Sequence, residues 1–392
     1  MISLNELNPI FERIQNGQVN ETDIRTLHQL LAVNAKQGIV QLGKYNINIG
    51  QAQDIQIGDR VYQGADADVI RELLQDVLQE YKLLPDQTKS PTQIWRYLHT
   101  FRGHAGAVNS LVIAPEQQTL ISGGDDRSIK IWQLNTMQFL HELPKGQKPV
   151  SKLLLNSDGV TLLSGSEGGT IKFWNFVDRA LLHTLPEIHI GAITALALSS
   201  NGQTLATAGT DRTIKIWNLP TKELLQTLPS GQTFVKTMAF SPNEQVLITG
   251  SQGGTIKYWR SETGELLYPL AGAHESSINS LLIRPNSLQL ITGSSDQTIK
   301  IWDFETRELL QTLDRGKTPV VSMAISQDGH TLVSGSEGGT AKFWDLLHGE
   351  LLYILTGIHR SAINAIALSS DSKICVTGSE GGMIKVWRKR VE

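Results

Sequence analysis

The stretch TLATAGTDRTIKIW, residues 204–217, decides the fold of this chain. It contains a short apolar segment, a tight turn with Gly, Thr and Asp, and a second segment in which Thr, Ile and Lys alternate up to Trp217. Alternation of β-branched and polar residues is typical of a β-strand with one buried face. The stretch therefore predicts two strands joined by a turn, the second ending on a tryptophan.

The same pattern recurs along the chain at an almost constant spacing. Seven tryptophans close equivalent segments, at intervals of 42, 43, 42, 43, 42 and 43 residues: Trp132, Trp174, Trp217, Trp259, Trp302, Trp344 and Trp387. Each repeat holds about four strand-like segments with turn residues between them. A fixed period of this length indicates a repeat architecture in which each unit packs on its neighbours.

These repeats resemble the WD-repeat family of β-propellers over residues 91–392. The resemblance implies an all-β fold, a seven-bladed propeller of four-stranded blades. Few residues follow Trp387, so the last repeat lacks a fourth strand, whereas residues 94–101 look like a fourth strand without a blade. We expect this segment to complete blade seven, which closes the ring and leaves no open sheet edge.

Histidines mark a second period, of 85 residues. In three of four cases an Asp follows 22 residues later, and the intervening repeats have Gly at both positions. The resemblance implies a buried network that also includes a Ser or Thr and the Trp. The sets are His104, Ser122, Asp126, Trp132; His189, Thr207, Asp211, Trp217; and His274, Thr292, Asp296, Trp302. Blade seven departs from this rule, with His359 but Gly381 in place of Asp.

A His, a Ser and an Asp in one repeat also suit a catalytic triad. Because the set recurs three times, we interpret it as architecture and expect no catalytic residue, cofactor or metal ion. Cys375 is the single cysteine, so no cysteine cluster can bind zinc. A lysine stands two residues before each repeat tryptophan, and we expect its stem to lie along neighbouring strands with a solvated head.

In the WD-repeat family, partners usually bind the face built by the loop into the innermost strand and by the turn before the Trp strand. The candidate residues there are Lys148, Phe234, Lys317 and Arg360 from the loops, and Glu167, Glu337 and Glu380 from the turns. Phe234 replaces a small residue found in the other blades. It is either an anchor for a bound peptide or packed on a neighbouring loop.

The segment before the repeats has a different character. We expect a small α+β domain at 1–84, a proline-containing linker at 85–93 and the propeller at 94–392. Helical spacing covers 3–15, 20–32 and 66–83, and residues 46–50 and 54–58 predict two short strands, in a hairpin or a small solenoid-like turn. Residues 43–64 resemble the effector-associated, adaptor-like domains of bacterial multidomain proteins. This resemblance implies homotypic pairing with another protein; the alternative is a module that oligomerises or caps the propeller.

Charge restricts the function. The net charge is −3, with −4 in residues 1–90 and +1 in residues 91–392, which disfavours a nucleic-acid binder that relies on bulk charge. The start of the chain lacks the basic and apolar regions of a signal peptide, and no apolar run approaches the ~18 residues of a membrane helix. We therefore expect a cytoplasmic protein.

The leading hypothesis is a non-catalytic scaffold or adaptor, in which the propeller recognises a protein or peptide and the N-terminal domain recruits an effector or a second copy. One alternative is an enzyme or small-ligand binder that uses the central channel. Another is a nucleic-acid binder, which would need Lys148, Arg315, Lys317 and Arg360 to cluster. Acidic residues in the neighbouring turns oppose the latter.

Overall fold

The computed structural model of this chain describes residues 95–389 apart from Asn286, and four short strands between residues 39 and 63. For Asp314 and Arg315 it describes the backbone alone. The chain divides into two compact units, Met1–Ser90 and Pro91–Glu392. Within the described residues, no helix is both long and apolar enough to span a membrane.

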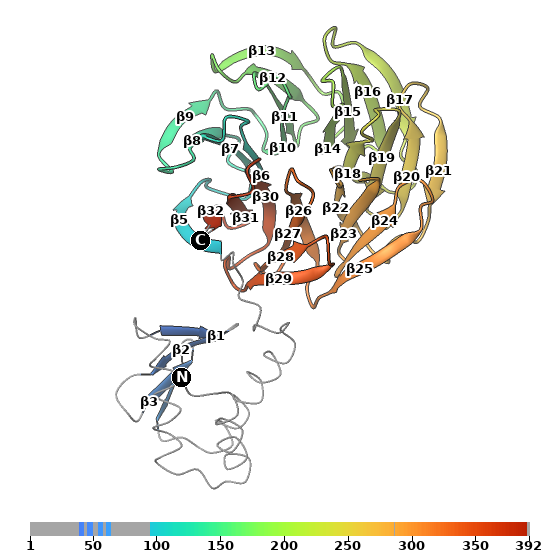
Figure 1. Cartoon of the computed structure of the whole chain (residues 1–392). Helices are drawn as coiled ribbons and strands as arrows, with labels where there is room; N and C mark the ends of the chain where they lie inside the picture. The colour runs from blue at the N-terminus through green and yellow to red at the C-terminus, as the bar shows by residue number, and fades with distance from the viewer. Residues whose placement is uncertain are drawn as a thin grey trace. The chain divides into compact units, whose positions relative to one another are not determined.

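Residues 95–389 form seven four-stranded antiparallel sheets arranged as a ring, in agreement with the predicted seven-bladed propeller (Figure 1). From the centre outward, blade one contains β6 (Val108–Ile113), β7 (Thr119–Gly124), β8 (Ile129–Gln133) and β9 (Phe139–Leu143). Blade two contains β10 (Val150–Leu155), β11 (Thr161–Ser166), β12 (Ile171–Asn175) and β13 (Ala180–Leu185). Blade three contains β14 (Ile193–Leu198), β15 (Thr204–Gly209), β16 (Thr213–Asn218) and β17 (Leu224–Pro229).

The remaining blades repeat this order. Blade four contains β18 (Val235–Phe240), β19 (Val246–Ser251), β20 (Ile256–Arg260) and β21 (Leu266–Leu270). Blade five contains β22 (Ile278–Ile283), β23 (Gln289–Ser294), β24 (Thr298–Asp303) and β25 (Leu309–Arg315). Blade six contains β26 (Val320–Ile325), β27 (Thr331–Ser336), β28 (Ala341–Asp345) and β29 (Glu350–Leu355). Blade seven contains β30 (Ile363–Leu368), β31 (Ile374–Ser379), β32 (Met383–Lys389) and β5 (Trp95–Arg102).

Blade seven joins the two ends of the propeller. β5 pairs antiparallel with β32, from Arg102 opposite Met383 to Trp95 opposite Lys389. Figure 1 shows the cyan β5 beside the red β32. The expected closing strand at 94–101 is thus confirmed, displaced by one residue at each end. The strand is also packed into its neighbours, because Trp95 is 5% exposed and its ring lies 4.8 Å from that of Phe343 in blade six.

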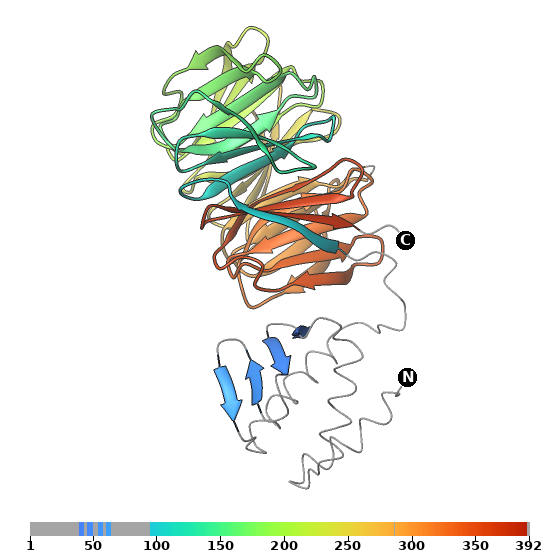
Figure 2. The ribbon, with the colours of Figure 1, turned by 90° about the vertical axis from the view of Figure 1, so that its left-hand side faces the viewer.

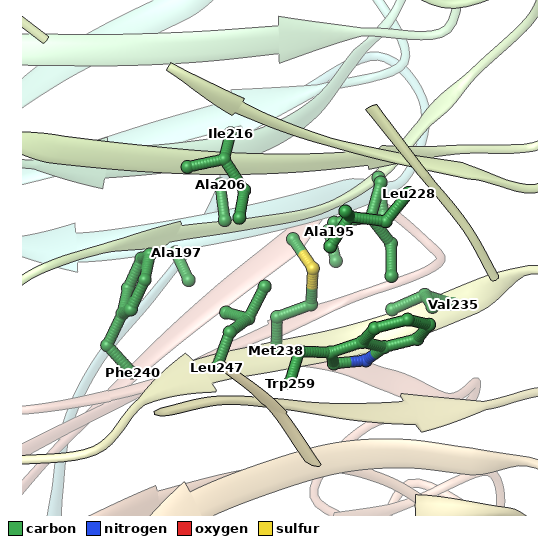
Figure 3. Close-up of a cluster of buried hydrophobic side chains, with 12 residues drawn as sticks. Ala195, Ala197, Ala206, Ile216, Leu228, Val235, Met238, Phe240, Leu247 and Trp259 are labelled. Atoms are coloured by element: carbon green, nitrogen blue, oxygen red, sulfur yellow. The ribbon is translucent and has the colours of Figure 1, made fainter. Parts of the chain in front are cut away.

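The core lies between the blades. Among the described residues, seven clusters of buried apolar side chains occur, one at each junction of neighbouring blades. Figure 3 shows the cluster between blades three and four, where Trp259 and Met238 of blade four meet small residues of blade three such as Ala195 and Ala206. Viewed from the side, the sheets stand face to face around the ring (Figure 2). Large residues opposite small ones give a close fit between sheets.

Side-chain alternation explains the strands. In β16, Ile214, Ile216 and Trp217 are buried, whereas Thr213 and Lys215 are half-buried. The strand runs antiparallel to β15 but has an irregular register with β17 between Ile216 and Trp217. Irregularities of this type locally increase strand twist. The same irregularity precedes all seven repeat tryptophans.

The N-terminal unit contains an antiparallel sheet of four short strands in sequence order. These are β1 (Ile39–Leu42), β2 (Tyr45–Ile49), β3 (Asp54–Ile57) and β4 (Arg60–Gln63). The pairing of β2 with β3 confirms the hairpin expected at 46–58. β1 and β4 were not predicted, because four residues are too few to show a clear alternation. The helices expected at 3–15, 20–32 and 66–83, and the linker at 85–93, lie outside the described residues.

Candidate functional site

The structure brings together the four residues of each predicted network. In blade one, His104 Nδ1 lies 2.7 Å from Asp126 Oδ1, and His104 Nε2 lies 2.7 Å from Ser122 Oγ. Trp132 Nε1 donates to Ser122 Oγ at 2.9 Å. Ser128 Oγ also donates to Asp126, at 2.5 Å. Through His104, the network therefore links the loop that leads into the inner strand with the second and third strands of the same blade.

The bonding pattern fits a neutral histidine. Because the Trp132 indole donates to Ser122, the serine hydroxyl is free to donate to His104 Nε2, which leaves Nδ1–H to donate to the Asp126 carboxylate. Burial lowers the pKa of His104 despite the nearby carboxylate. Hydrogen bonds from Ser128 and His104 outweigh burial at Asp126 and hold the pKa of that carboxyl well below its usual range. Every polar side chain in this buried hydrogen-bonded network therefore has a partner.

Blades three and five repeat this geometry. His189 lies 3.0 Å from Asp211 and 2.8 Å from Thr207, and His274 lies 2.8 Å from Asp296 and 2.7 Å from Thr292. The indoles donate to the same hydroxyls, Trp217 to Thr207 and Trp302 to Thr292. In blade seven, His359 Nε2 still lies 2.9 Å from Thr377 Oγ1, but Gly381 offers no carboxylate.

Blades two, four and six have Gly in place of both His and Asp, and we call them Gly-type blades, in contrast to the His-type blades one, three and five. In the Gly-type blades another side chain fills the position of the missing Asp. A Cβ on Gly168 would lie 2.9 Å from the side chain of Lys148, so that lysine stem already covers the place of the missing Asp. Threonines contact the equivalent glycines in blades four and six, Thr233 at Gly253 and Thr318 at Gly338. In the His-type blades one and three the covering position is itself Gly. The loss of His and Asp is therefore compensated locally by a larger loop residue.

A substrate could not reach the Ser-His-Asp set, so the set does not act as a catalytic triad. Ser122, His104 and Asp126 have the connectivity of a Ser-His-Asp triad. However, Ser122 is completely buried and its oxygen is occupied by the indole of Trp132, so no substrate carbonyl can approach it. Within the described part of the chain, no group of three or more His, Cys, Asp or Glu side chains is placed to hold a metal ion. Cys375 is buried, which raises the pKa of its thiol.

The expectation of solvated lysine heads is wrong in four blades. Lys130 Nζ donates to the carbonyl of Gly103 at 2.7 Å. The equivalent ammonium groups donate to the loop carbonyls 27 residues upstream: Lys215 to Ile188, Lys257 to Ser230 and Lys300 to Ala273. In blade two the Lys172 ammonium lies 5.4 Å from the centre of the Trp174 ring. The four carbonyl-bonded lysines tie the third strand to the loop, which favours a structural role for them over a polyanion site.

One face of the ring gathers all the predicted binding candidates. We call it the upper face: it consists of the turns between second and third strands and the loops that lead into the inner strands. In every blade a backbone N–H of the turn donates to a backbone carbonyl of the loop, for example Glu167 to Pro149 and Gln252 to Phe234. The same bond occurs at Asp125, Thr210, Ser295, Glu337 and Glu380. Turn and loop are therefore held as one rigid surface in each blade.

The charged candidates occupy this surface in pairs. Lys148 and Glu167 are exposed in blade two, Lys317 and Glu337 in blade six, and Arg360 and Glu380 in blade seven. Because each basic residue shares its blade with an acidic one, the surface is of mixed charge. Lys148 belongs to blade two, whereas Lys317 and Arg360 belong to the neighbouring blades six and seven, so the three basic residues are spread over the ring and interspersed with glutamates. The side chain of Arg315 is outside the described part of the chain.

The apolar candidates lie in the neighbouring blades three and four. Phe234 is half-buried, so it is only partly available as an anchor. Ile190, which the sequence reasoning missed, is 87% exposed and directly follows His189. The other blades place Ala, Gln, Glu, Lys or Arg at this position. A large apolar residue where the other blades have Ala or a polar side chain is the signal that could have identified it. The upper face thus has a mixed-charge region and an apolar region.

The seven inner strands surround a cavity of about 220 Å³ on the ring axis. Two charged side chains line it, Lys152 of β10 and Lys236 of β18. The repeat pattern does not point to blade-specific polar residues on the axis, yet these two lysines are such residues. Both lysines stand where most other inner strands have Asn, Ser, Thr or Ala, so an alignment of inner strands would have shown them.

Comparison with known proteins agrees with this geometry. The family model described as "WD domain, G-beta repeat" matches seven segments: 95–133, 137–175, 179–218, 222–260, 264–303, 307–345 and 349–388. The model described as "Effector-associated domain 10" matches residues 1–77. The predicted resemblances of both parts are therefore confirmed.

Curated relatives match over a short segment. The ribosome biogenesis protein BOP1 homolog of Culex quinquefasciatus is 35% identical over 46 residues, which is 12% of this chain and 5% of the relative. The homolog from Aedes aegypti is 33% identical over a segment of the same length. The aligned segment thus spans about one twentieth of each relative, roughly one repeat. The seven repeat matches cover most of the chain, and the protein belongs to the WD domain, G-beta repeat family.

Proposed function

We propose that the protein is a non-catalytic interaction scaffold, in which the upper face of the propeller recognises a protein or peptide and the N-terminal unit recruits a second protein with a like domain. The observation that carries the first part is the exposed Ile190 of blade three, next to blade two with its exposed Lys148 and Glu167. An apolar anchor with a polar, charged surround is typical of a protein-binding surface.

The rigidity of the face supports this function. A backbone hydrogen bond fixes each turn to its loop, and the networks of His104, His189 and His274 lie directly beneath three of these loops. The side chains on top are therefore presented in a set arrangement before any partner arrives. Binding to a preorganised surface has a smaller free-energy cost, because fewer side chains and loops become ordered when the partner binds.

The second part of the proposal draws on the match of residues 1–77 to effector-associated domain 10. This unit is compact by itself, and the propeller closes its ring using residues 95–102. A chain of residues 91–392 therefore keeps every strand of the propeller. Comparing it with the full chain separates partners held by the N-terminal unit from partners held by the propeller.

The test of the upper face is affinity capture with the full chain and two matched variants, read by quantitative mass spectrometry. Ile190→Asp places a charge on the upper face. Val177→Asp makes the same change at a 66% exposed residue in the turn between β12 and β13, at the opposite end of blade two. We expect Ile190→Asp to reduce the capture of propeller partners about tenfold or more, since hot-spot residues contribute about 2 kcal/mol or more.

Val177→Asp should leave that capture unchanged. Equal capture by wild type and Ile190→Asp would exclude the apolar region of the upper face as a recognition site. Partners that disappear only when residues 1–90 are removed would be assigned to the N-terminal unit. Turnover of a substrate that a single upper-face or channel substitution abolishes would contradict a non-catalytic scaffold.

A further inference from the structure

The axis of the propeller carries an uncompensated pair of positive charges. The cavity there is lined by side chains of all seven inner strands, and Lys152 and Lys236 are its charged members. They come from blades two and four. The inner strand of blade three, between them, contributes Ala195 and Leu196 to the lining of the same cavity.

Both lysines lie at a register shift of their inner strand. In each inner strand the register with the second strand shifts just after the first residue, as between Val150 and Lys152 and between Val235 and Thr237. Lys236 is itself the extra, unpaired residue at the register shift of β18. Lys152 directly follows the extra residue at the register shift of β10. Irregularities of this kind re-aim side chains relative to a regular strand. Both side chains are half-buried.

The positive charge of Lys236 acts on the ammonium group of Lys152. Burial is the larger cause that lowers the pKa of Lys152, and the positive charge of Lys236 adds to it. No residue that lines the described cavity is acidic. Asp125 contacts the lining residue Asn109, and its oxygens already accept from Asn109 Nδ2 at 2.7 Å and from the backbone of Ala107 at 3.3 Å.

Two like charges in a confined space repel unless a counter-ion lies between them. We propose that the central channel binds a small oxyanion of the phosphate class between Lys152 and Lys236. The hydroxyl groups of Thr237 and Ser280 line the same cavity and are further donors. At about 220 Å³ the cavity is smaller than the roughly 300–1,000 Å³ of ordinary ligand pockets, which favours an inorganic ion over a metabolite.

The test uses the full chain and inorganic phosphate as the probe. The melting temperature is measured with phosphate and with chloride at matched ionic strength, and phosphate binding is measured by isothermal titration calorimetry. We expect phosphate to raise the melting temperature of the wild type more than chloride does, because a ligand that binds only the folded state stabilises it. Lys152→Met and Lys236→Met should each weaken phosphate binding about tenfold or more.

A matched control is Lys373→Met, which changes an exposed lysine in the turn between β30 and β31 that does not line the cavity. It should bind phosphate as the wild type does. Without phosphate, Lys152→Met should melt at or above the wild-type temperature, because the repulsion between the two ammonium groups is removed. Undiminished phosphate binding by both channel variants, or no phosphate effect on the wild type, would overturn the proposal. The result is independent of whether the upper face binds a protein.

Discussion

At the scale of single residues, the direction of each hydrogen bond explains the alternation of two blade types. A neutral His accepts from a hydroxyl and donates to an Asp, so removing one member leaves a buried polar group without its partner, at a cost of about 1–3 kcal/mol. The sequence reveals which residues form the sets. It does not reveal the loop side chains, such as Lys148 and Thr233, that fill the space when the Asp is absent.

Blade seven is the incomplete member, and completing it should stabilise the protein. Gly381 has no left-handed backbone angle, and a Cβ there would lie 3.3 Å from Ser361 Oγ, so Asp fits with a small shift. Met383 stands where blades one, three and five have a hydroxyl that bonds the Asp. We expect Gly381→Asp with Met383→Thr to raise the free energy of unfolding by about 1–2 kcal/mol, measured by chemical denaturation.

Gly381→Asp alone should stabilise less, because its carboxylate lacks the hydroxyl donor. The matched control is the same pair of changes in a His359→Gln background, where the new carboxylate has no imidazole N–H to accept from. The gain should vanish there. An unchanged or lower stability of the Gly381→Asp, Met383→Thr variant would show that the Asp in the other blades does not stabilise them in this way.

At the scale of elements, β5 is the strand that makes the ring. Its position was predictable because the last repeat lacks a fourth strand and residues 94–101 resemble one. Its packing was not predictable from spacing, since it depends on contacts with three blades. Trp95 meets Phe343 of blade six, Tyr97 meets Trp387 of blade seven, and Phe101 meets Trp132 of blade one at 4.7 Å.

Replacing the buried anchor of this strand should weaken closure. We expect Trp95→Ala to lower the free energy of unfolding by about 3–5 kcal/mol, the usual cost of removing a large buried aromatic side chain. Tyr97→Ala is the control within the same strand: Tyr97 is 50% exposed, and its loss should cost about 1.5 kcal/mol or less. Equal effects of the two substitutions in denaturant titrations would contradict a special role for Trp95.

At the scale of the whole molecule, four buried histidines give the propeller a shared sensitivity to acid. Burial lowers the pKa of His104, His189, His274 and His359, in the last case to about 4 from the ordinary 6.5. The unfolded chain therefore takes up protons at a higher pH than the folded one. The stability that these histidines contribute is complete above pH 6.5 and is lost as the pH falls from 6.5 toward 4.

We expect the melting temperature to fall between about pH 7 and about pH 5, with each histidine contributing up to about 1.4 kcal/mol per pH unit within its window. The lowered pKa values of Asp126, Asp211 and Asp296 add a further loss only at more acidic pH. His359→Gln should reduce the slope, because it removes one titrating group. A melting temperature that stays constant over this range would rule out neutral buried histidines.

Sequence and structure differ in what each reveals about the whole ring. The period of the tryptophans predicts the number of blades, because every blade must bury the same faces against its neighbours. A repeat pattern describes what the blades share, whereas a binding surface depends on where they differ. Ile190 on the upper face and Lys152 in the channel are such departures, and their importance depends on exposure and on distances between blades.

The pairing of β5 with β32 also has a mechanical consequence. Trp95 and Lys389 are partners at one end of this ladder. A pull applied across those two residues therefore opens the hydrogen bonds one after another from that end, instead of loading all of them together. Under such a load the pairing of β5 with β32 opens at the force needed to break one pair of hydrogen bonds at a time. In each of the other six blades the outer strand directly follows the third strand in the sequence, so these blades have no comparable weak end.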